Sequence, residues 1–563
     1  MPSQIARSDE YRAFEEIYRT EWAWRQGELG GGWLTADEPL DPKLPDVSVE
    51  AQQRRERYWQ EIMNRLDRVD RGRLGVEEAA DYDVYRYQIS VFRGRQRFKM
   101  YERPANADSA FWMELTSECR RRLESAADAE TYAQWLGEIP RYIDQNITNM
   151  RAGVRRGFGP AQVSMIGREA TIRSVAQAPS AESSVFFQPL AGLPETVADH
   201  DQWRKVGAEL IKSDVIPAYQ RLLSFFTDEY FPALPTDIAA RNQPDGNAFY
   251  AAQLYEYATT DLTAEEIHRI GLDAVASIRA EMAEVAGSAG FIDADAMLRH
   301  MRTDPSFYET TATGLLRFTA WQAKQFDARA HHYFGRLPRM RFGIEEPPPE
   351  LAPFYTFGRG GPHRYVLNTY NLPARPLYSI PALTLHEAAP GHAFQVPFAL
   401  EMTQHPDYRR KDYISAFGEG WALYTERLGV EMGMYETPFE MMGMLSFQMW
   451  RAVRLVIDPG MHALGWTREQ AQDYLRDNTA ISDHEIVTEV DRYIAWPGQA
   501  TAYYLGMLKI MELRRRAESA LSESFSIRSF HDQVLALGSV PLPVLETAID
   551  QFISNGGRSP FED

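Results

Sequence analysis

The chain has 563 residues, which is more than usually fold around a single hydrophobic core. Its contents of 44% hydrophobic and 25% charged residues are typical of a globular protein. This composition argues against disorder, and the net charge of −19 argues against nucleic acid as a partner, because phosphates require a basic surface. The single cysteine, Cys119, excludes an internal disulfide and provides no CxxC pair.

The start of the chain carries no visible export signal. The first twenty residues lack the apolar core of a secretory signal peptide. No segment is apolar over the length that a membrane-spanning helix requires. We therefore expect a soluble protein, cytoplasmic as the sequence stands and periplasmic or secreted if a signal peptide has been removed; its oligomeric state is open.

Helical periodicity dominates the pattern of apolar residues. Between Tyr11 and Trp22 these residues recur at steps of three and four, which predicts an amphipathic helix. Thr263 and Glu266 have the spacing of a capping box, and Thr437 precedes a proline, as at many helix starts. Further helices are predicted over residues 49–69, 201–228, 437–457, 467–478 and 499–519.

A proline-rich linker, Glu345 to Pro353, divides the chain into two parts. It separates a helical N-terminal region from a region that carries the motifs described below. We therefore expect a scaffold lobe over residues 1–345 and a motif-bearing lobe over residues 346–563, arranged around one cleft rather than as independent domains. Directly after the linker, two aromatic and β-branched runs flank a glycine-rich turn between Phe354 and Tyr370, which predicts a β-hairpin.

The segment HEAAPGH, residues 386–392, contains donors for a metal ion. His386 and His392 offer imidazoles and Glu387 a carboxylate, the combination that hydrolytic zinc sites use. In the zinc-peptidase motif H-E-x-x-H the histidines are four residues apart, whereas a spacing of six turns them about 120° apart on a regular helix. Pro390 and the glycine after it permit an irregular backbone, so we predict a bulge that returns His392 to the face of His386. The alternative is a helix start that happens to contain histidines.

A third ligand is expected from the next predicted helix, Gly418 to Gly433. Glu419 and Glu426 are two turns apart and lie on one face, among apolar neighbours that pack this helix inward. Because a buried carboxylate requires a partner, we predict that Glu419 binds the metal and that Glu426 accepts a hydrogen bond from a ligating histidine. The alternative for both is a solvated helix charge.

A second polar cluster follows towards the end of the chain. Arg492 and Tyr493 are adjacent, and Tyr503 and Tyr504 follow about ten positions later. Amide hydrolysis passes through a tetrahedral oxyanion, which a phenol or a guanidinium can stabilise. Tyr493 is the candidate donor, Arg492 supports it or binds a substrate carboxylate, and the two later tyrosines are candidate substrate contacts. On chemistry alone, core aromatic side chains with polar tips are the favoured interpretation.

Taken together, these segments resemble a known family. HEAAPGH, GEGWALY, RYVLNTYNLPARPLY and RYIAWPGQATAYYLG resemble segments of the bacterial family catalogued as domain of unknown function 885. The stretch YATTDLTAEEIHRIGL, residues 257–272, is also similar to the middle of that family. The family is similar in turn to the gluzincin zinc peptidases, which include angiotensin-converting enzyme, the thimet-type oligopeptidases and carboxypeptidase Taq.

This resemblance implies a mostly α-helical, two-lobed gluzincin-like fold with a deep central cleft and a small β-hairpin beside the metal site. It implies Zn²⁺ held by His386, His392 and Glu419, with Glu387 as general base. The RY pair resembles that of the converting enzyme, whose tyrosine stabilises the transition state. The hairpin resembles the strand that holds an extended substrate, and there Asn368 is a candidate substrate contact or a turn cap. The lengthened histidine spacing departs from the gluzincin pattern and belongs to the closer family.

The leading hypothesis is a zinc metallopeptidase that cleaves short peptides or peptide-like amides, as an oligopeptidase or a carboxypeptidase. One alternative keeps the metal but acts on an amide of a non-peptide metabolite. Another is a catalytically silent protein that binds peptides or other ligands on a peptidase scaffold. Replacing Glu387 by Gln separates these classes, because it should abolish turnover and spare zinc binding.

Overall fold

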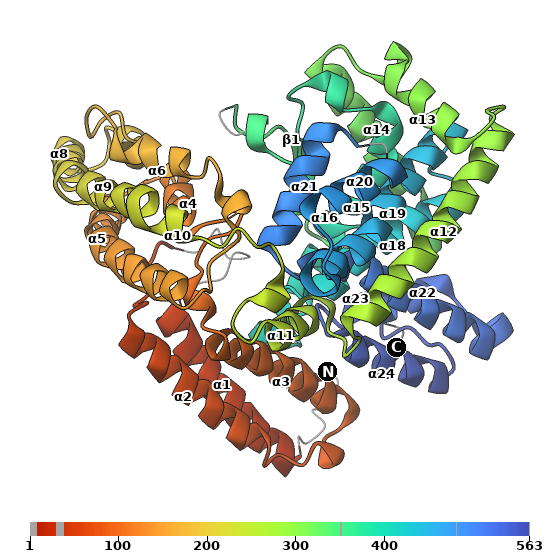
Figure 1. Cartoon of the computed structure of the whole chain (residues 1–563). Helices are drawn as coiled ribbons and strands as arrows, with labels where there is room; N and C mark the ends of the chain where they lie inside the picture. Colours follow the sequence, from red (N-terminus) through yellow and green to blue (C-terminus); the bar gives the residue numbers. More distant parts are fainter. Residues whose placement is uncertain (1–7, 30–38, 108, 350–351, 480, 562–563) are drawn as a thin grey trace. The chain divides into compact units, whose positions relative to one another are not determined.

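The computed structural model describes residues 8–29, 39–107, 109–349, 352–479 and 481–561. Among these residues it is mostly α-helical with one three-stranded sheet (Figure 1), which confirms the predicted helical class and the small β element. The chain forms two compact units: unit 1 comprises residues 1–249 and 488–496, and unit 2 comprises residues 250–487 and 497–563. The boundary expected after residue 345 therefore lies within unit 2.

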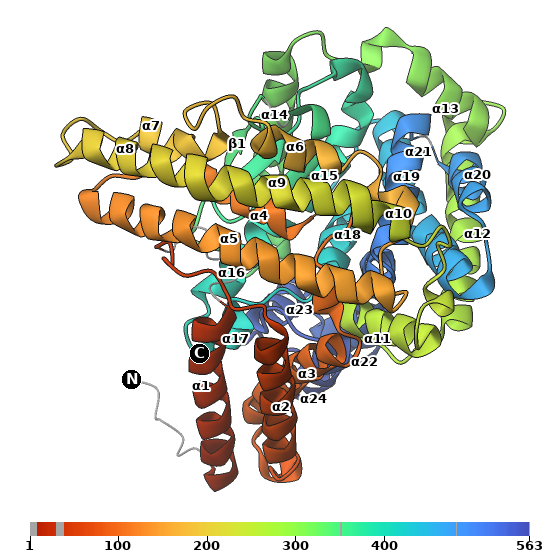
Figure 2. The same ribbon diagram turned by 60° about the vertical axis from the view of Figure 1, so that its left-hand side comes forward.

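Unit 1 consists of two groups of helices. The first contains α1 (Asp9–Leu29), α2 (Val49–Leu66) and α3 (Val76–Arg97). In the second, α5 (Ala126–Arg155) lies beside α9 (Ile216–Phe225), as Figure 2 shows. The shorter helices are α4 (Phe111–Ser117), α6 (Glu169–Ala176), α7 (Gln188–Ala191), α8 (His200–Leu210) and α10 (Phe231–Ala233). Two π-helical turns join α8, α9 and α10, so the helix predicted over residues 201–228 is present with irregular turns.

Unit 2 is built around two long helices, α18 (Ser415–Glu431) and α19 (Pro438–Pro459). Helix α12 (Ala264–Ser288) packs along α19, and α22 (Ala502–Leu521) packs along α18. The other helices are α13 (Ala294–Thr303), α14 (Ala312–Tyr333), α15 (Ile380–Glu387), α16 (His392–Glu401), α17 (Asp407–Arg410), α20 (Arg468–Asn478), α23 (Ile527–Ala536) and α24 (Leu542–Ser554). The predicted capping box at Thr263 and the predicted N-cap at Thr437 are both confirmed. Helices α11 (Gly246–Ala258) and α21 (Asp483–Ala495) contain residues of both units.

The close approach of α18 and α22 fixes the position of α18. A Cβ atom at Gly506 of α22 would lie 1.9 Å from the carbonyl oxygen of Ala416, and one at Gly420 of α18 would lie 2.5 Å from the backbone of Gly506. Side chains at either position would force the two backbones apart. The glycines of the GEGWALY and YYLG segments thus let the two helices pack in contact.

The predicted hairpin is present and belongs to a small mixed sheet. Strand β2 (Gly358–Gly361) pairs antiparallel with β3 (Arg364–Leu367), with Gly360 opposite Tyr365. Strand β1 (Gly343–Glu345) pairs in parallel with the other edge of β3, so the strand order is β1-β3-β2. Strand β2 also packs against α15 and α16, the helices that carry the histidines.

Among the described residues, no helix combines the length and the apolar character needed to cross a bilayer. This agrees with the sequence, in which no such stretch was expected.

Candidate metal centre

Two separate helices supply the histidines. Helix α15 ends at Glu387 and α16 begins at His392, and the residues between them are not helical. The predicted bulge within one continuous helix is therefore wrong: the helix stops and a new one starts. The physical reason is that the backbone leaves helical dihedrals at both ends of the connection, with ψ −107° at Ala388 and ψ −135° at Gly391. The peptide bond between Ala389 and Pro390 is cis.

The connection between the two helices is fixed by contacts with its surroundings. A Cβ at Gly391 would lie 1.8 Å from the carbonyl oxygen of His386, so only glycine allows the chain to pass this close to the end of α15. The indole N–H of Trp421 on α18 donates to the carbonyl oxygen of Pro390 at 2.7 Å. These contacts hold the second helix so that His392 faces His386, with ring centroids 5.0 Å apart.

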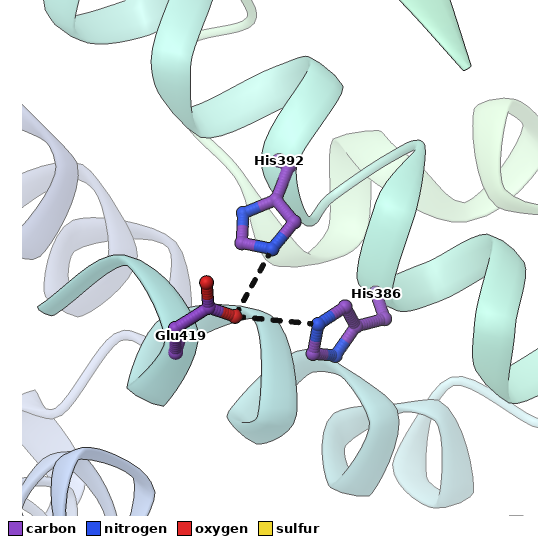
Figure 3. A group of neighbouring side chains, drawn as sticks. All are labelled: His386, His392 and Glu419. Carbon is purple, nitrogen blue, oxygen red and sulfur yellow. Dashed lines mark ion pairs between the residues drawn. The ribbon is translucent and has the colours of Figure 1, made fainter. Parts of the chain in front are cut away.

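Both imidazoles point at one carboxylate on α18, as Figure 3 shows. The Oε2 atom of Glu419 lies 3.6 Å from Nε2 of His386 and 3.3 Å from Nε2 of His392. One donor atom from each of the three residues lies within 4.8 Å of the other two. The three residues that the sequence singled out as ligands are thus brought together in unit 2.

Glu426 lies two turns further along α18 and contacts the ring nitrogen of His386 that does not face Glu419. The Nδ1 atom of His386 is 2.8 Å from Oε1 of Glu426, a hydrogen bond that directs Nε2 towards Glu419. Glu426 is fully buried, and its Oε2 accepts a longer hydrogen bond from Gln448 of α19 at 3.4 Å. This is the arrangement in which an outer carboxylate orients a metal-binding imidazole.

The electrostatics of the cluster favour a positive charge at this point. Burial lowers the pKa of His386, but hydrogen bonds to Glu419 and Glu426 outweigh burial and raise that pKa to about 10. Burial raises the pKa of Glu419, but the charge of His392 and hydrogen bonds from both histidines hold it well below its usual value. Carboxylates that favour a protonated imidazole would also favour a cation among the same atoms.

The hairpin orients the carboxylate of Glu387. The backbone N–H of Gly360 on β2 donates to Oε2 of Glu387 at 2.6 Å. A Cβ at Gly360 would lie 1.7 Å from the carbonyl oxygen of Glu387, so the close approach of strand and helix requires glycine. The hairpin was predicted beside the site from the sequence, but Gly360 was not, and its only sequence signal is the glycine-rich character of the turn.

Tyr413 was also missed by sequence analysis. Its hydroxyl donates to Oε1 of Glu419 at 2.9 Å, and its ring centroid is 6.2 Å from that of His392. A Cβ at Gly418 would lie 2.4 Å from this ring, so the glycine before Glu419 makes room for the tyrosine. Gly418 was the available sequence signal, but a glycine alone does not indicate which residue packs against it.

The remaining predicted site residues occupy other places. Arg492 and Tyr493 belong to unit 1, where Tyr493 donates to Oε2 of Glu489 at 2.6 Å and Arg492 contacts the same oxygen at 3.3 Å. Since the cluster of His386, His392 and Glu419 belongs to unit 2, the role assigned to this pair stays a prediction.

Three further predicted contact residues belong to unit 2. Asn368 is buried and caps the turn before the hairpin by donating to the carbonyl oxygens of Ala352 and Tyr355, at 2.9 and 2.8 Å. The Tyr503 ring centroid lies 4.7 Å from the guanidinium carbon of Arg454. Tyr504 is buried, which raises its pKa to about 12. A substrate contact by any of the three stays a prediction.

Comparisons with known proteins agree with the resemblance to the bacterial family catalogued as domain of unknown function 885. A family model described as "Bacterial protein of unknown function (DUF885)" matches residues 25–549. The chain is similar to the crystal structure of "the putative lipoprotein from Colwellia psychrerythraea", with 25% identity and a TM-score of 0.87 over 97% of this chain and 98% of that one. It is also similar in fold to "a putative lipoprotein of unknown function from Shewanella oneidensis", with 16% identity and a TM-score of 0.67 over 95% and 98% of the two chains. No curated protein matches the chain.

Proposed function

Because this chain belongs to the bacterial DUF885 family of unknown function, its activity must be inferred from its own side chains, and we propose a zinc-dependent hydrolase of peptide or amide bonds in short peptides. The observation that carries the proposal is the convergence of His386, His392 and Glu419, whose donor atoms lie within 4.8 Å of one another. They come from three different helices, so their convergence is a property of the tertiary packing.

The donor set fits a catalytic zinc ion. Two imidazole nitrogens and one carboxylate oxygen are the ligands of several zinc hydrolases, in which a further position stays open for water. When bound, the ion supplies Lewis acidity and lowers the pKa of a bound water towards neutrality. The Nε2 atoms of His386 and His392 and Oε2 of Glu419 would hold it, and Glu426 and Tyr413 would keep the ligands in place.

Glu387 is the proposed general base. Its Oε2 accepts the hydrogen bond from Gly360, and its Oε1 accepts none from the described residues. That second oxygen is therefore available to take a proton from the attacking water and to return it to the leaving amine. The backbone hydrogen bond fixes the direction of the carboxylate, which proton transfer at a defined position requires.

The remaining parts of the proposal rest on the gluzincin resemblance. They are the two-lobed architecture with a central cleft, Tyr493 as the donor to the oxyanion, Arg492 as its support, and the hairpin edge as the support of an extended substrate. The similarity to a structure described as a putative lipoprotein supports an extracytoplasmic location as part of the same proposal.

The proposal is tested by zinc content and turnover measured on the same preparations. Purified wild-type protein is expected to hold one zinc ion and to cleave members of a short-peptide library. Glu387→Gln should keep the zinc and lose turnover, whereas His392→Ala should lose both. Glu431→Gln is the matched control, because this exposed glutamate of α18 pairs with Arg514 and should leave zinc and turnover unchanged.

The other outcomes distinguish the alternatives. Zinc binding without peptide cleavage, but with cleavage of small non-peptide amides, would indicate an amidohydrolase. Protein that purifies without metal and cleaves no amide would overturn the hydrolase proposal and favour a ligand-binding protein.

A further inference from the structure

In unit 2 the buried arginines Arg375 and Arg451 contact a connected set of aromatic rings, and we term these residues the arginine–aromatic cluster: Arg375, Phe357, Phe447, Trp450 and Arg451. A third buried arginine, Arg454, also contacts Trp450, at 4.8 Å. The Arg451 guanidinium lies 4.8 Å from the ring centroid of Phe447 and 4.7 Å from that of Trp450. The Arg375 guanidinium lies 5.0 Å from the ring of Phe357, and the centroids of Phe357 and Phe447 are 6.4 Å apart.

Neither arginine forms an ion pair with a described residue, although the charge of Glu485 partly offsets the lowering of the pKa of Arg375 by burial. Arg451 is 6% exposed; among the described residues its buried Nε has no hydrogen-bond partner, and its Nη1 donates to the carbonyl oxygen of Phe447 at 3.4 Å. Arg375 is 8% exposed and donates to the carbonyl oxygens of Asn368 and Ala374, at 3.0 and 3.4 Å. A buried guanidinium without an anion is unfavourable, because the ring contacts replace only part of its hydration.

Two members of the cluster lie close in the sequence to residues that support the metal centre. Gln448, next to Phe447 on α19, donates to the glutamate that holds His386. Phe357 directly precedes β2, whose Gly360 holds the proposed base Glu387. The cluster therefore lies next to the supports of both the metal ligand and the base.

We propose that the arginine–aromatic cluster is a subsite for a carboxylate of the substrate, with Arg451 as its principal donor. A carboxylate would supply Arg451 with the anion that no described residue provides, and a guanidinium can bind it through two parallel hydrogen bonds. The aromatic rings exclude water and strengthen this interaction. The inference rests on the proposed function, which it deepens: the substrates are short peptides that carry either a free C-terminal carboxylate or an acidic side chain near the scissile bond.

The test measures binding, so that it does not depend on turnover. Full-length Glu387→Gln protein loaded with zinc is titrated calorimetrically with three sets of tripeptides: neutral with a free C-terminus, neutral with an amidated C-terminus, and amidated with one aspartate. We expect at least one carboxylate-bearing set to bind about 10- to 100-fold more tightly than the neutral amidated set. The set that does so identifies the source of the carboxylate.

Variants of Arg451 assign the preference to this side chain. Arg451→Met should abolish the preference without lowering the melting temperature, since it removes a buried charge that no described residue neutralises. Arg451→Lys should keep part of the preference. Arg427→Met removes an arginine that pairs with Glu281 and should leave the preference intact.

Three results would overturn this inference: equal binding of all three sets, no binding of any set, or a preference that survives in Arg451→Met. If the wild type cleaves no amide but the Arg451-dependent preference is found, the hydrolase proposal fails and the carboxylate subsite stands. If peptides are cleaved regardless of their carboxylates, the subsite fails alone.

Discussion

Replacement of Glu426 by Gln tests whether the outer carboxylate behind His386 supports metal binding. The change keeps the shape of the side chain and removes its charge. The glutamine oxygen can still accept from Nδ1 of His386, at the position where Glu426 now accepts at 2.8 Å. The new amide N–H₂ group, however, would face the Nε2 donor of Gln448, which now donates to Glu426 at 3.4 Å.

The expected magnitude follows from the loss of charge assistance. A hydrogen bond to a charged group contributes about 1.5–3 kcal/mol and a neutral one about 0.5–1.5 kcal/mol, so the substitution should cost about 1–1.5 kcal/mol. This corresponds to about a tenfold weaker zinc affinity, at the lower end of the roughly 10- to 100-fold effect that outer-sphere substitutions typically have. Glu419→Gln should weaken zinc binding much further, because it removes a ligand.

The assay is competition for zinc with a chelator of known affinity, performed on wild type, Glu426→Gln, Glu419→Gln and the surface control Glu431→Gln. The melting temperature of each metal-free protein shows whether it is folded. A folded Glu426→Gln protein with wild-type zinc affinity would refute the role assigned to this carboxylate. If Glu426→Gln lost more affinity than Glu419→Gln, Glu426 itself would have to be the ligand.

Three further substitutions test the packing and electrostatics of unit 2. Gly360→Ala should retain zinc but lower turnover about 100-fold, because the new Cβ would displace the strand that orients Glu387; full turnover, measured beside zinc content, would contradict this. Burial raises the pKa of Asp458 to about 7, so its contribution to stability is complete below about pH 4 and is lost progressively as the pH rises to 7. Between pH 5 and pH 8 this loss amounts to about 3 kcal/mol, and Asp458→Asn should remove that difference from the free energies of unfolding measured with urea at the two pH values. Gly506→Ala should destabilise the protein by about 1–3 kcal/mol or more, because its Cβ would meet a backbone carbonyl of α18, whereas Gly287→Ala in open space should not; equal urea midpoints for the two variants would contradict this.

The sequence predicted the helices through local signals. Thr263 and Thr437 cap helices where their side chains were expected to do so, because a cap bonds to backbone only a few residues away. The hairpin was equally predictable from its glycine-rich turn. The donor types in HEAAPGH and on the following helix could also be read directly, since residue identity alone decides which atoms can bind a metal.

The path of the backbone between the two histidines could not be predicted in the same way. A bulge and a complete break both bring His392 back towards His386, and the local sequence allows either. The break is selected by contacts from elsewhere in the chain, including the Trp421 indole that bonds to Pro390. Such contacts depend on how α18 packs, which no short segment encodes.

The sequence by itself therefore determined the helical class, the caps and hairpin, and the chemical identity of the candidate ligands, because these depend on residue type and on neighbours close in the chain. Only the tertiary structure decided that three helices place those candidate ligands within reach of one another, that Gly360 orients Glu387, and that Arg451 is buried without an ion pair to any described residue. Each of these depends on close packing between segments far apart in the sequence, where one additional Cβ atom would force the packed segments apart.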